Sequence, residues 1–430
     1  MRQVLVRTFG CKLNQYDSQL ITESFARSGY GIAKDPSTAD VWVVNTCSVT
    51  ARSDYQARQL VRRAVRSGTK PLVVVTGCYS QRAPEELARI EGVGLVTGNV
   101  EKASLPRLVD GLTPGELART VVSPPDEEGC AAGCGPEFQR RARALVKVQV
   151  GCDSSCSYCV VPSVRGKSRS VRARDVLREV AAVTERGYTE VVLTGARVGS
   201  YRDVTAGGLS LSGLVEALVD AGTGFRIRLS SLEPAEVSQS LLEAAGGDRV
   251  CPHFHVPLQS GDDGILRAMG RPYSASEYAE RIRWVVEALP HACVGADVIA
   301  GFPGETEARF ARTYGLVERL PLAYLHVFPF SGRPGTAAVR MKGEVPGVVK
   351  KARVRALMEL SETKRREFAL SRAGSYETAV LEQQNEDGSW TATTGNYLKV
   401  RVQSAGRAAG EAVRVKIGSL SEGRLAAEEC

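Results

Sequence analysis

Short apolar runs alternate with polar, helix-compatible stretches along most of the chain. In the first third, three such runs cover residues 4–11, 41–47 and 72–78, and each of them ends in a cysteine. Continuous apolar runs bounded by turn signals predict strands that are buried in a parallel sheet. Residues 17–28 and 54–67 lie between these runs and predict helices, so this part of the chain is expected to form an open parallel α/β sheet.

The same alternation resumes after a stretch that is rich in turn-forming residues. Six further apolar runs are separated by helical segments within about 200 residues. Strand–helix repeats in this number predict a complete or partial (β/α)6 barrel whose active site lies at the carboxyl ends of its strands. The six strands are expected at residues 144–150, 190–194, 226–230, 253–258, 292–299 and 324–330.

The last part of the chain changes character twice. Residues 341–367 have a helical pattern with eight Lys or Arg against four Glu, which predicts a basic connecting helix. Four β-type runs follow, and Asp387-Gly388 between the first two is a hairpin signal. These runs predict a small all-β barrel with strands at residues 376–381, 389–394, 397–402 and 412–417.

These patterns divide the α/β chain into three structural units and a linker. The N-terminal parallel α/β domain is expected over residues 1–122, the linker over 123–143, the partial barrel with its basic helix over 144–367, and the all-β barrel over 368–430. A chain of 430 residues is long enough for several domains of ordinary size.

Composition indicates an ordinary globular protein, whereas the charge favours a polyanionic partner. Hydrophobic residues make up 43% and charged residues 24% of the chain, which is typical of soluble proteins. The net charge is +8, and residues 139–174 contain nine basic side chains against one acidic side chain. Such a belt is either a solvated surface or a binding site for a polyanion such as nucleic acid.

The amino terminus and the length of the apolar stretches lead us to expect a cytoplasmic protein. Arg2 and Arg7 interrupt the first apolar run, and no apolar stretch is long enough to span a bilayer, so we expect no contact with a membrane. In a reducing compartment, the eleven cysteines are expected to be metal ligands or buried thiols and not disulfides.

The most specific stretch is residues 151–159, which contains Cys152, Cys156 and Cys159 and follows the first predicted strand of the partial barrel. Thiolates are the usual ligands of zinc and of iron–sulfur clusters. A cubane cluster has four irons, so three protein ligands leave one iron open to a substrate or cofactor. We therefore interpret this loop as catalytic.

Cys11, Cys47 and Cys78 form a second set although they are far apart in the sequence. Each follows a predicted parallel strand, and the carboxyl ends of such strands meet at the edge where open α/β sheets bind ligands. A single cysteine of this kind would be a small buried apolar residue. Three at equivalent strand ends predict a second three-thiolate site.

Other candidate residues are less specific. Cys130 and Cys134 lie in the linker and are interpreted as incidental surface thiols. His253 and His255 fall within a predicted strand without a paired acid or nucleophile at a recognisable spacing, so we interpret them as core or pocket-lining residues. Polar or glycine-rich loops follow several strands of the partial barrel, which favours a binding pocket at its mouth.

The Cys-x3-Cys-x2-Cys spacing, with Tyr158 before the last cysteine, resembles the signature of radical S-adenosylmethionine enzymes. Further motifs resemble the methylthiotransferases of that superfamily, and the resemblance covers nearly the whole chain. Residues 14–17 and 158–162 are most similar to the branch that methylthiolates threonylcarbamoyladenosine at position 37 of tRNA, and residues 394–400 resemble the RNA-binding TRAM barrel. The remaining matching motifs are GCKLNQYDS at 10–18, NTC at 45–47, GC at 77–78, PLQSG at 257–261 and GFPGET at 301–306.

This resemblance implies two 4Fe-4S clusters, S-adenosylmethionine and a tRNA substrate. The cluster on Cys152, Cys156 and Cys159 would bind S-adenosylmethionine at its open iron and yield a 5'-deoxyadenosyl radical. The cluster on Cys11, Cys47 and Cys78 would carry the sulfur that is methylated and transferred to C2 of adenine. The base in the anticodon loop is expected to be splayed into the pocket between the clusters.

The resemblance also implies contacts to the cofactor and to RNA, while no residue is assigned as a general acid or base. Contacts to S-adenosylmethionine are expected from Tyr158, Gly195, Glu233 and Gln259, and contacts to RNA phosphates from Arg165, Lys167 and Arg169.

Two alternatives stay open. One is a methylthiotransferase that acts on isopentenyladenosine in tRNA or on a side chain of a ribosomal protein. The other belongs to a different class, a non-catalytic RNA-binding protein with structural zinc. Iron and zinc content, together with separate assays on each modified tRNA, distinguish these functions.

Overall fold

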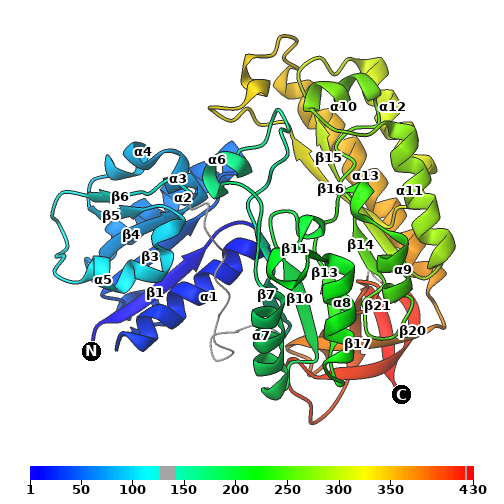
Figure 1. Ribbon diagram of the computed structural model, residues 1–430, viewed down its shortest axis with the longest axis horizontal. Helices are drawn as coiled ribbons and strands as arrows, with labels where there is room; N and C mark the ends of the chain where they lie inside the picture. The colour runs from blue at the N-terminus through cyan, green and yellow to red at the C-terminus, as the bar shows by residue number, and fades with distance from the viewer. Residues whose placement is uncertain (126–141, 422–423) are drawn as a thin grey trace.

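The computed structural model describes residues 1–125, 142–421 and 424–430, and it folds into three bodies that follow one another along the chain. Figure 1 shows an α/β sheet at the N-terminus, a larger curved array of strands and helices, and a small barrel at the C-terminus. Cys130 and Cys134 lie outside the described residues. Among the described residues, no helix has the length and apolar content needed to cross a membrane.

The N-terminal body is a six-stranded parallel sheet in the order β2-β1-β3-β4-β5-β6. Its two central strands, β3 and β4, are buried at every position, as their continuous apolar sequences predict. The strands are β1 Gln3–Thr8, β2 Gly31–Ile32, β3 Val41–Thr46, β4 Leu72–Gly77, β5 Val93–Thr97 and β6 Arg119–Val121. The α-helices are α1 Lys12–Arg27, α2 Ala51–Val65, α3 Cys78–Arg82, α4 Pro84–Ala88 and α5 Leu105–Val109.

The central body contains the six predicted strands as two three-stranded parallel sheets that curve into a half-barrel. Side chains alternate along each strand. Val191 and Leu193 belong to the apolar cluster under the outer helices, whereas Val192 between them faces the interior of the half-barrel and packs with Leu145. The strands are β7 Ala144–Lys147, β10 Glu190–Thr194, β13 Arg226–Leu229, β14 His253–His255, β15 Cys293–Ala300 and β16 Tyr324–Pro329.

Most helices of the central body cover the outer face of the half-barrel, whereas α6 lies beside α3 of the N-terminal body, and α13 runs beside the last strand (Figure 1). This long helix is the predicted basic connecting helix. The α-helices are α6 Val161–Arg165, α7 Ala173–Glu185, α8 Leu211–Asp220, α9 Gln239–Ala245, α10 Asp263–Met269, α11 Ala275–Ala288, α12 Glu307–Arg319 and α13 Gly347–Ser371.

The C-terminal body is a closed five-stranded barrel in the order β17-β18-β19-β21-β20, which confirms the predicted small all-β barrel. The last strand was not predicted, because its sequence is rich in Ala and Glu, which are depleted in strands, although Leu425 and Ala427 point into the core. The strands are β17 Tyr376–Gln384, β18 Trp390–Thr394, β19 Lys399–Gln403, β20 Ala412–Ser421 and β21 Arg424–Glu429.

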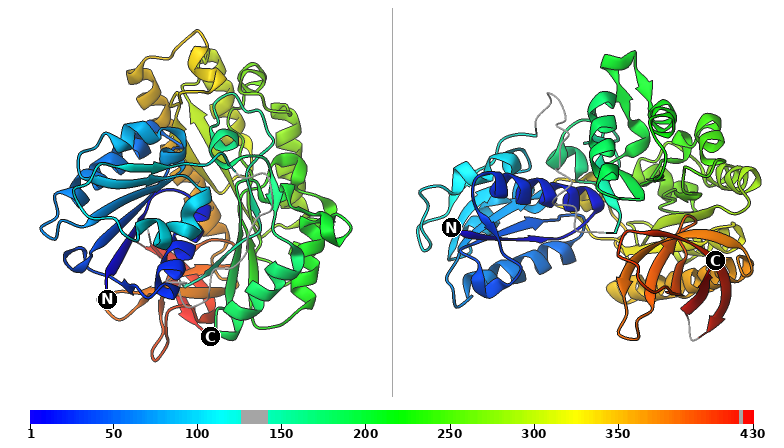
Figure 2. Two further views of the ribbon diagram at one scale, coloured as in Figure 1. Left: turned by 60° about the vertical axis from the view of Figure 1, so that its left-hand side comes forward. Right: turned by 90° about the horizontal axis from the view of Figure 1, so that it is seen from below.

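Both smaller bodies pack against the half-barrel. Helix α1 lies beside β7, and Tyr16 fills a small apolar cluster with Leu145 and Val192 (Figure 1). The C-terminal barrel lies against the end of the half-barrel where its strands begin (Figure 2). The buried guanidinium of Arg228 joins these two bodies by donating to the carbonyl oxygens of Thr394 and Gly395, each at 2.9 Å.

Candidate active site

The loop with Cys152, Cys156 and Cys159 begins at a backbone position that only glycine can occupy. Gly151 has a φ of 78°, and a Cβ atom at this position would lie 1.9 Å from the carbonyl oxygen of Lys167. The amide of Cys152 donates to the carbonyl oxygen of Gly166 at 3.1 Å. The loop is therefore held against the segment after α6, at the carboxyl end of the half-barrel.

The surroundings of these three sulfur atoms fit a negatively charged group. The amides of Ser154 and Val161 donate to Cys152 Sγ and Cys159 Sγ, each at 3.4 Å, and Arg271 Nη1 donates to Cys156 Sγ at 3.3 Å. Burial raises the pKa of the Cys159 thiol to about 12, so this residue without a metal is a neutral thiol at pH 7. Ligation releases that proton, and the donors around the loop stabilise the resulting thiolate charge.

The structure also brings together Cys11, Cys47 and Cys78, at the carboxyl edge of the N-terminal sheet. Cys11 precedes α1, Cys47 follows β3, and Cys78 is the first residue of α3. The pKa of Cys47 is raised to about 12, mainly by burial and in smaller part by the neighbouring Cys78 and Cys11. Gly10, with a φ of 100°, permits this approach, because a Cβ atom there would lie 2.7 Å from Cys47 Sγ.

Asn14 holds the strand ends of this second site in register. Its side-chain nitrogen donates to the carbonyl oxygens of Phe9 at 2.6 Å and Thr46 at 3.0 Å. These carbonyls lie two and one residues before Cys11 and Cys47. Asn99 acts similarly at the third cysteine, since its side-chain nitrogen donates to Cys78 Sγ at 3.8 Å and to the carbonyl oxygen of Val164 at 2.8 Å. The side-chain amides of Asn14 and Asn99 thus support the second cysteine site in addition to the strand ends.

Arg165 does not face solvent, so the expectation that it contacts RNA phosphates is wrong. Its side chain is 6% exposed and donates to Asp17 Oδ2 at 2.8 Å and Asn14 Oδ1 at 3.0 Å. Burial alone would lower the pKa of Arg165, but the charges of Asp17, Cys78 and Cys11 outweigh it and raise that pKa. The residue therefore ties α6 of the half-barrel to the second cysteine site.

The two other predicted RNA-contacting residues lie nearer the surface. Lys167 is exposed, and Arg169 is half-buried and donates from Nη2 to the carbonyl oxygen of Arg165 at 2.9 Å. Both follow the cysteine loop on the segment that packs against Gly151. Both basic side chains therefore lie on the segment beside that loop.

The four residues predicted to contact S-adenosylmethionine lie around the mouth of the half-barrel. Tyr158 packs in an apolar cluster with Ile299, Gly195 follows β10, and Glu233 forms an ion pair with Arg271. Gln259 has a φ of 66°, and its amide donates to the carbonyl oxygen of Asp297 at 2.8 Å. A positive φ at a residue other than glycine is a strained conformation, which is common at binding sites. Arg271 completes this ring and was missed, because nothing in the sequence links it to the cysteine loop.

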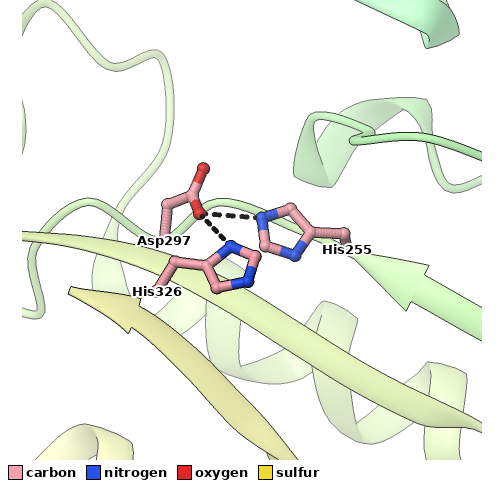
Figure 3. A group of neighbouring side chains, drawn as sticks. All are labelled: His255, Asp297 and His326. Atoms are coloured by element: carbon pink, nitrogen blue, oxygen red, sulfur yellow. Dashed lines mark hydrogen bonds and ion pairs between the residues drawn. The ribbon is translucent and has the colours of Figure 1, made fainter. Parts of the chain in front are cut away.

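Polar side chains from the neighbouring strands β14, β15 and β16 point toward one another (Figure 3). Asp297 Oδ1 is 2.9 Å from His255 Nε2 and 3.2 Å from His326 Nδ1. Tyr324 Oη lies 3.1 Å from His255 Nδ1 and 2.9 Å from His253 Nε2. The two buried histidines thus line the interior, which agrees with their interpretation as core or pocket residues, whereas His326 was not singled out from the sequence.

Comparison with known proteins decides the family. Residues 3–98 match the uncharacterized protein family UPF0004, and residues 146–317 match the Radical SAM superfamily. Threonylcarbamoyladenosine tRNA methylthiotransferase MtaB of Aquifex aeolicus is 36% identical over 417 residues, which are 96% of this chain and 100% of the relative. The chain belongs to the radical S-adenosylmethionine methylthiotransferase family.

Other relatives of this methylthiotransferase carry two different names. MtaB of Bacillus subtilis is 35% identical, with 97% of this chain and 94% of the relative aligned. The tRNA-2-methylthio-N(6)-dimethylallyladenosine synthase of Solibacter usitatus is 31% identical, with 93% of this chain and 95% of the relative aligned. Among solved structures, the radical S-adenosylmethionine methyltransferase TsrM of Kitasatospora setae shares the fold, with a TM-score of 0.55, 15% identity and coverage of 76% of this chain and 73% of that chain.

Membership of this family implies S-adenosylmethionine and a 4Fe-4S cluster as cofactors, and a second cluster is typical of methylthiotransferases. The free thiols, their donors and their burial fit such groups at both sites. The methylthiotransferase thus has two separate three-cysteine sites, one on each of its larger bodies.

Proposed function

We propose that this enzyme methylthiolates C2 of N6-threonylcarbamoyladenosine at position 37 of tRNA, with S-adenosylmethionine as radical source and methyl donor. The observation that carries the proposal is the presence of two three-cysteine sites in a chain whose relatives named MtaB align over almost their full length. In this proposal, residues 1–122, 144–367 and 368–430 form three domains, and the sequence-based linker at 123–143 lies mostly outside the described residues.

Each three-cysteine site would hold one 4Fe-4S cluster in this proposal. Cys152, Cys156 and Cys159 bind the first, and Cys11, Cys47 and Cys78 bind the second. When bound, these clusters supply the electron that cleaves S-adenosylmethionine and the sulfur that is transferred. The protein must orient the reactants and exclude water.

The residues around the first site can perform both tasks. Arg271 places a positive charge beside Cys156. Glu233, in the loop after β13, forms an ion pair with Arg271. The carboxylate and the guanidinium are opposite charges that match the amino and carboxylate groups of S-adenosylmethionine. The ring of Tyr158 packs against the apolar cluster that contains Met269 and Phe302. Gly195 and Gln259 offer backbone groups beyond the ends of β10 and β14.

The substrate would enter from the open side of the half-barrel. An adenine stacked in an anticodon loop does not expose C2 to a buried site, so the base must leave the stack. Lys167 and Arg169 lie beside the cysteine loop. Their positive charges would attract phosphates of the tRNA anticodon loop. Because the substrate is tRNA, the proposal places the enzyme in the cytoplasm.

A second candidate substrate is isopentenyladenosine in tRNA, which is favoured by relatives named for dimethylallyladenosine at 31% to 36% identity. Assays on tRNA that carries one modification or the other decide between them. Mass spectrometry of nucleosides is expected to detect the methylthio product only from threonylcarbamoylated tRNA. Turnover of isopentenylated tRNA at an equal rate would contradict the proposal.

A further inference from the structure

We propose that His255, Asp297 and His326 bind one zinc ion, at a third site that contains no cysteine. The three residues lie on the neighbouring parallel strands β14, β15 and β16 (Figure 3). Their ligand atoms, one from each side chain, all lie within 4.8 Å of one another. Two imidazoles and a carboxylate are a donor set that suits zinc. The inference adds ligation to the pocket-lining role of His255, and it does not depend on which tRNA is the substrate.

The strand register places the three side chains on one face of the sheet. Asp297 is paired directly with His326, and His255 is paired with Gly295, two residues before Asp297. Because side chains alternate along a strand, residues that are two positions apart point to the same side. The residues that flank the three ligands belong instead to the apolar cluster under the outer helices, namely Phe254, Val256, Ala296, Val298, Leu325 and Val327. The three potential ligands therefore share the opposite, inner face of the sheet.

The distances between the ligand atoms are close to those around a zinc ion. Asp297 Oδ1 lies 2.9 Å from His255 Nε2 and 3.2 Å from His326 Nδ1. Zinc binds imidazole nitrogen and carboxylate oxygen at about 2.0 to 2.2 Å, so two ligands at a tetrahedral angle are about 3.3 to 3.6 Å apart. Rotations of the side chains, without movement of the strands, would bring the three atoms to bonding distance.

Tyr324 orients the buried histidine of this group. Its hydroxyl oxygen lies 3.1 Å from His255 Nδ1 and 2.9 Å from His253 Nε2. When His255 Nε2 binds a metal, the ring hydrogen lies on Nδ1 and is donated to Tyr324 Oη, while that hydroxyl donates to His253 Nε2. Both contacts are kept in this arrangement, so binding of the ion leaves the surrounding hydrogen bonds intact.

Gly295 makes room for this tyrosine. A Cβ atom at position 295 would lie 2.1 Å from the ring of Tyr324 and 2.5 Å from its hydroxyl oxygen. Any larger residue would push the hydroxyl away from His255. The support of His255 is therefore built into β15, the strand that also carries Asp297.

The site is open to solvent on one side. The side chain of His326 is 52% exposed and that of Asp297 24%, whereas that of His255 is 8% exposed. His326 also lines a pocket of about 770 Å³ between β16, α13 and the C-terminal barrel, through which an ion can enter. Three protein ligands leave at least one coordination position open, which is typical of catalytic and not of structural zinc. The ion would hold a water molecule or another oxygen ligand at that position.

The test uses zinc as the probe and the anaerobically reconstituted enzyme as the sample, because cysteines without their clusters would also bind zinc. Equilibrium dialysis against buffered free zinc gives the dissociation constant, and X-ray absorption at the zinc edge identifies the ligand atoms. His326→Phe removes one ligand at an exposed position, and Tyr324→Phe removes only a hydroxyl. His291→Phe is the matched control, because His291 is an exposed histidine in the turn before β15.

The wild type and His291→Phe are expected to bind one zinc per chain, with nitrogen and oxygen ligands at about 2.0 to 2.2 Å. His326→Phe is expected to weaken zinc binding by more than about 100-fold, because changes beside a metal ligand alone cost about 10- to 100-fold. Tyr324→Phe is expected to fall within that smaller range. Zinc should raise the urea midpoint of the wild type and leave that of His326→Phe unchanged. Equal midpoints without zinc show that this variant is folded.

Three results would overturn the inference. If the wild type retains no zinc after dialysis, the three residues form a hydrogen-bonded group only. If His326→Phe binds zinc as tightly as the wild type, the zinc is an adventitious ion only. If the absorption spectrum shows sulfur ligands at about 2.3 Å, the zinc lies on cysteines. The methylthio nucleoside product of the wild type is measured separately, so failure of this inference and failure of the proposed function are distinguishable.

Discussion

Replacing Arg165 by methionine is expected to destabilise the contact between the half-barrel and the second cysteine site. Arg165 is buried and bonds Asp17 and Asn14 across the two bodies. Removing one partner of a buried ion pair costs about 3 to 5 kcal/mol. Lys102 Nζ still pairs with Asp17 at 2.6 Å, so we expect the lower end, about 3 kcal/mol.

Urea unfolding of the iron-loaded protein measures this loss, with the midpoint of the N-terminal transition as the readout. Arg174→Met is the control, because the side chain of Arg174 is 68% exposed and lies 3.8 Å from Asp175. Its unfolding free energy should change by less than about 0.5 kcal/mol. The iron content of Arg165→Met is also expected to fall, since Asn14 loses a partner that fixes the strand ends beside Cys11 and Cys47.

A double-mutant cycle with Asp17→Asn separates the ion pair from simple loss of packing. Residues in direct contact show coupling energies of about 0.5 to 3 kcal/mol. Equal midpoints for Arg165→Met and Arg174→Met would refute the buried-pair reasoning. So would a coupling energy of zero in the cycle.

Two further predictions concern the loop and the pH. Gly151→Ala is expected to abolish 5'-deoxyadenosine release, because the new methyl group would overlap the carbonyl oxygen of Lys167, and wild-type release from this variant would contradict the loop geometry. The charges of Arg165 and Lys102 outweigh burial and lower the pKa of Asp17. A lowered folded-state pKa stabilises the protein above the ordinary carboxyl pKa and is lost as the pH falls toward the lowered value. Acid unfolding of Asp17→Asn should therefore depend less on pH below about 4 than that of the wild type, and parallel acid profiles would argue against this assignment.

The strands of both larger bodies could be predicted because buried parallel strands are continuous apolar runs. The same logic places Cys11, Cys47 and Cys78 together, since each follows such a run. The motif spacing placed the other three cysteines in one loop. These features depend on neighbouring residues in the sequence or on the regular topology of a sheet.

The errors and omissions have a different physical origin. The charge of Arg165 gave no sign of its burial, which depends on Asp17 in another body of the protein. Arg271 and His326 contact Cys156 and Asp297, which are far from them in the sequence. No local pattern in a sequence encodes such long-range contacts between side chains.

Separate removal of the two cysteine sites tests the central claim most directly. The measurement is 5'-deoxyadenosine release and methylthio nucleoside formation by two triple alanine variants of the anaerobically reconstituted enzyme. The variant lacking Cys152, Cys156 and Cys159 is expected to lose both products. The variant lacking Cys11, Cys47 and Cys78 should still release 5'-deoxyadenosine while forming no methylthio product, with an unfolding midpoint that shows it is folded. Methylthio product from this second variant would contradict the account.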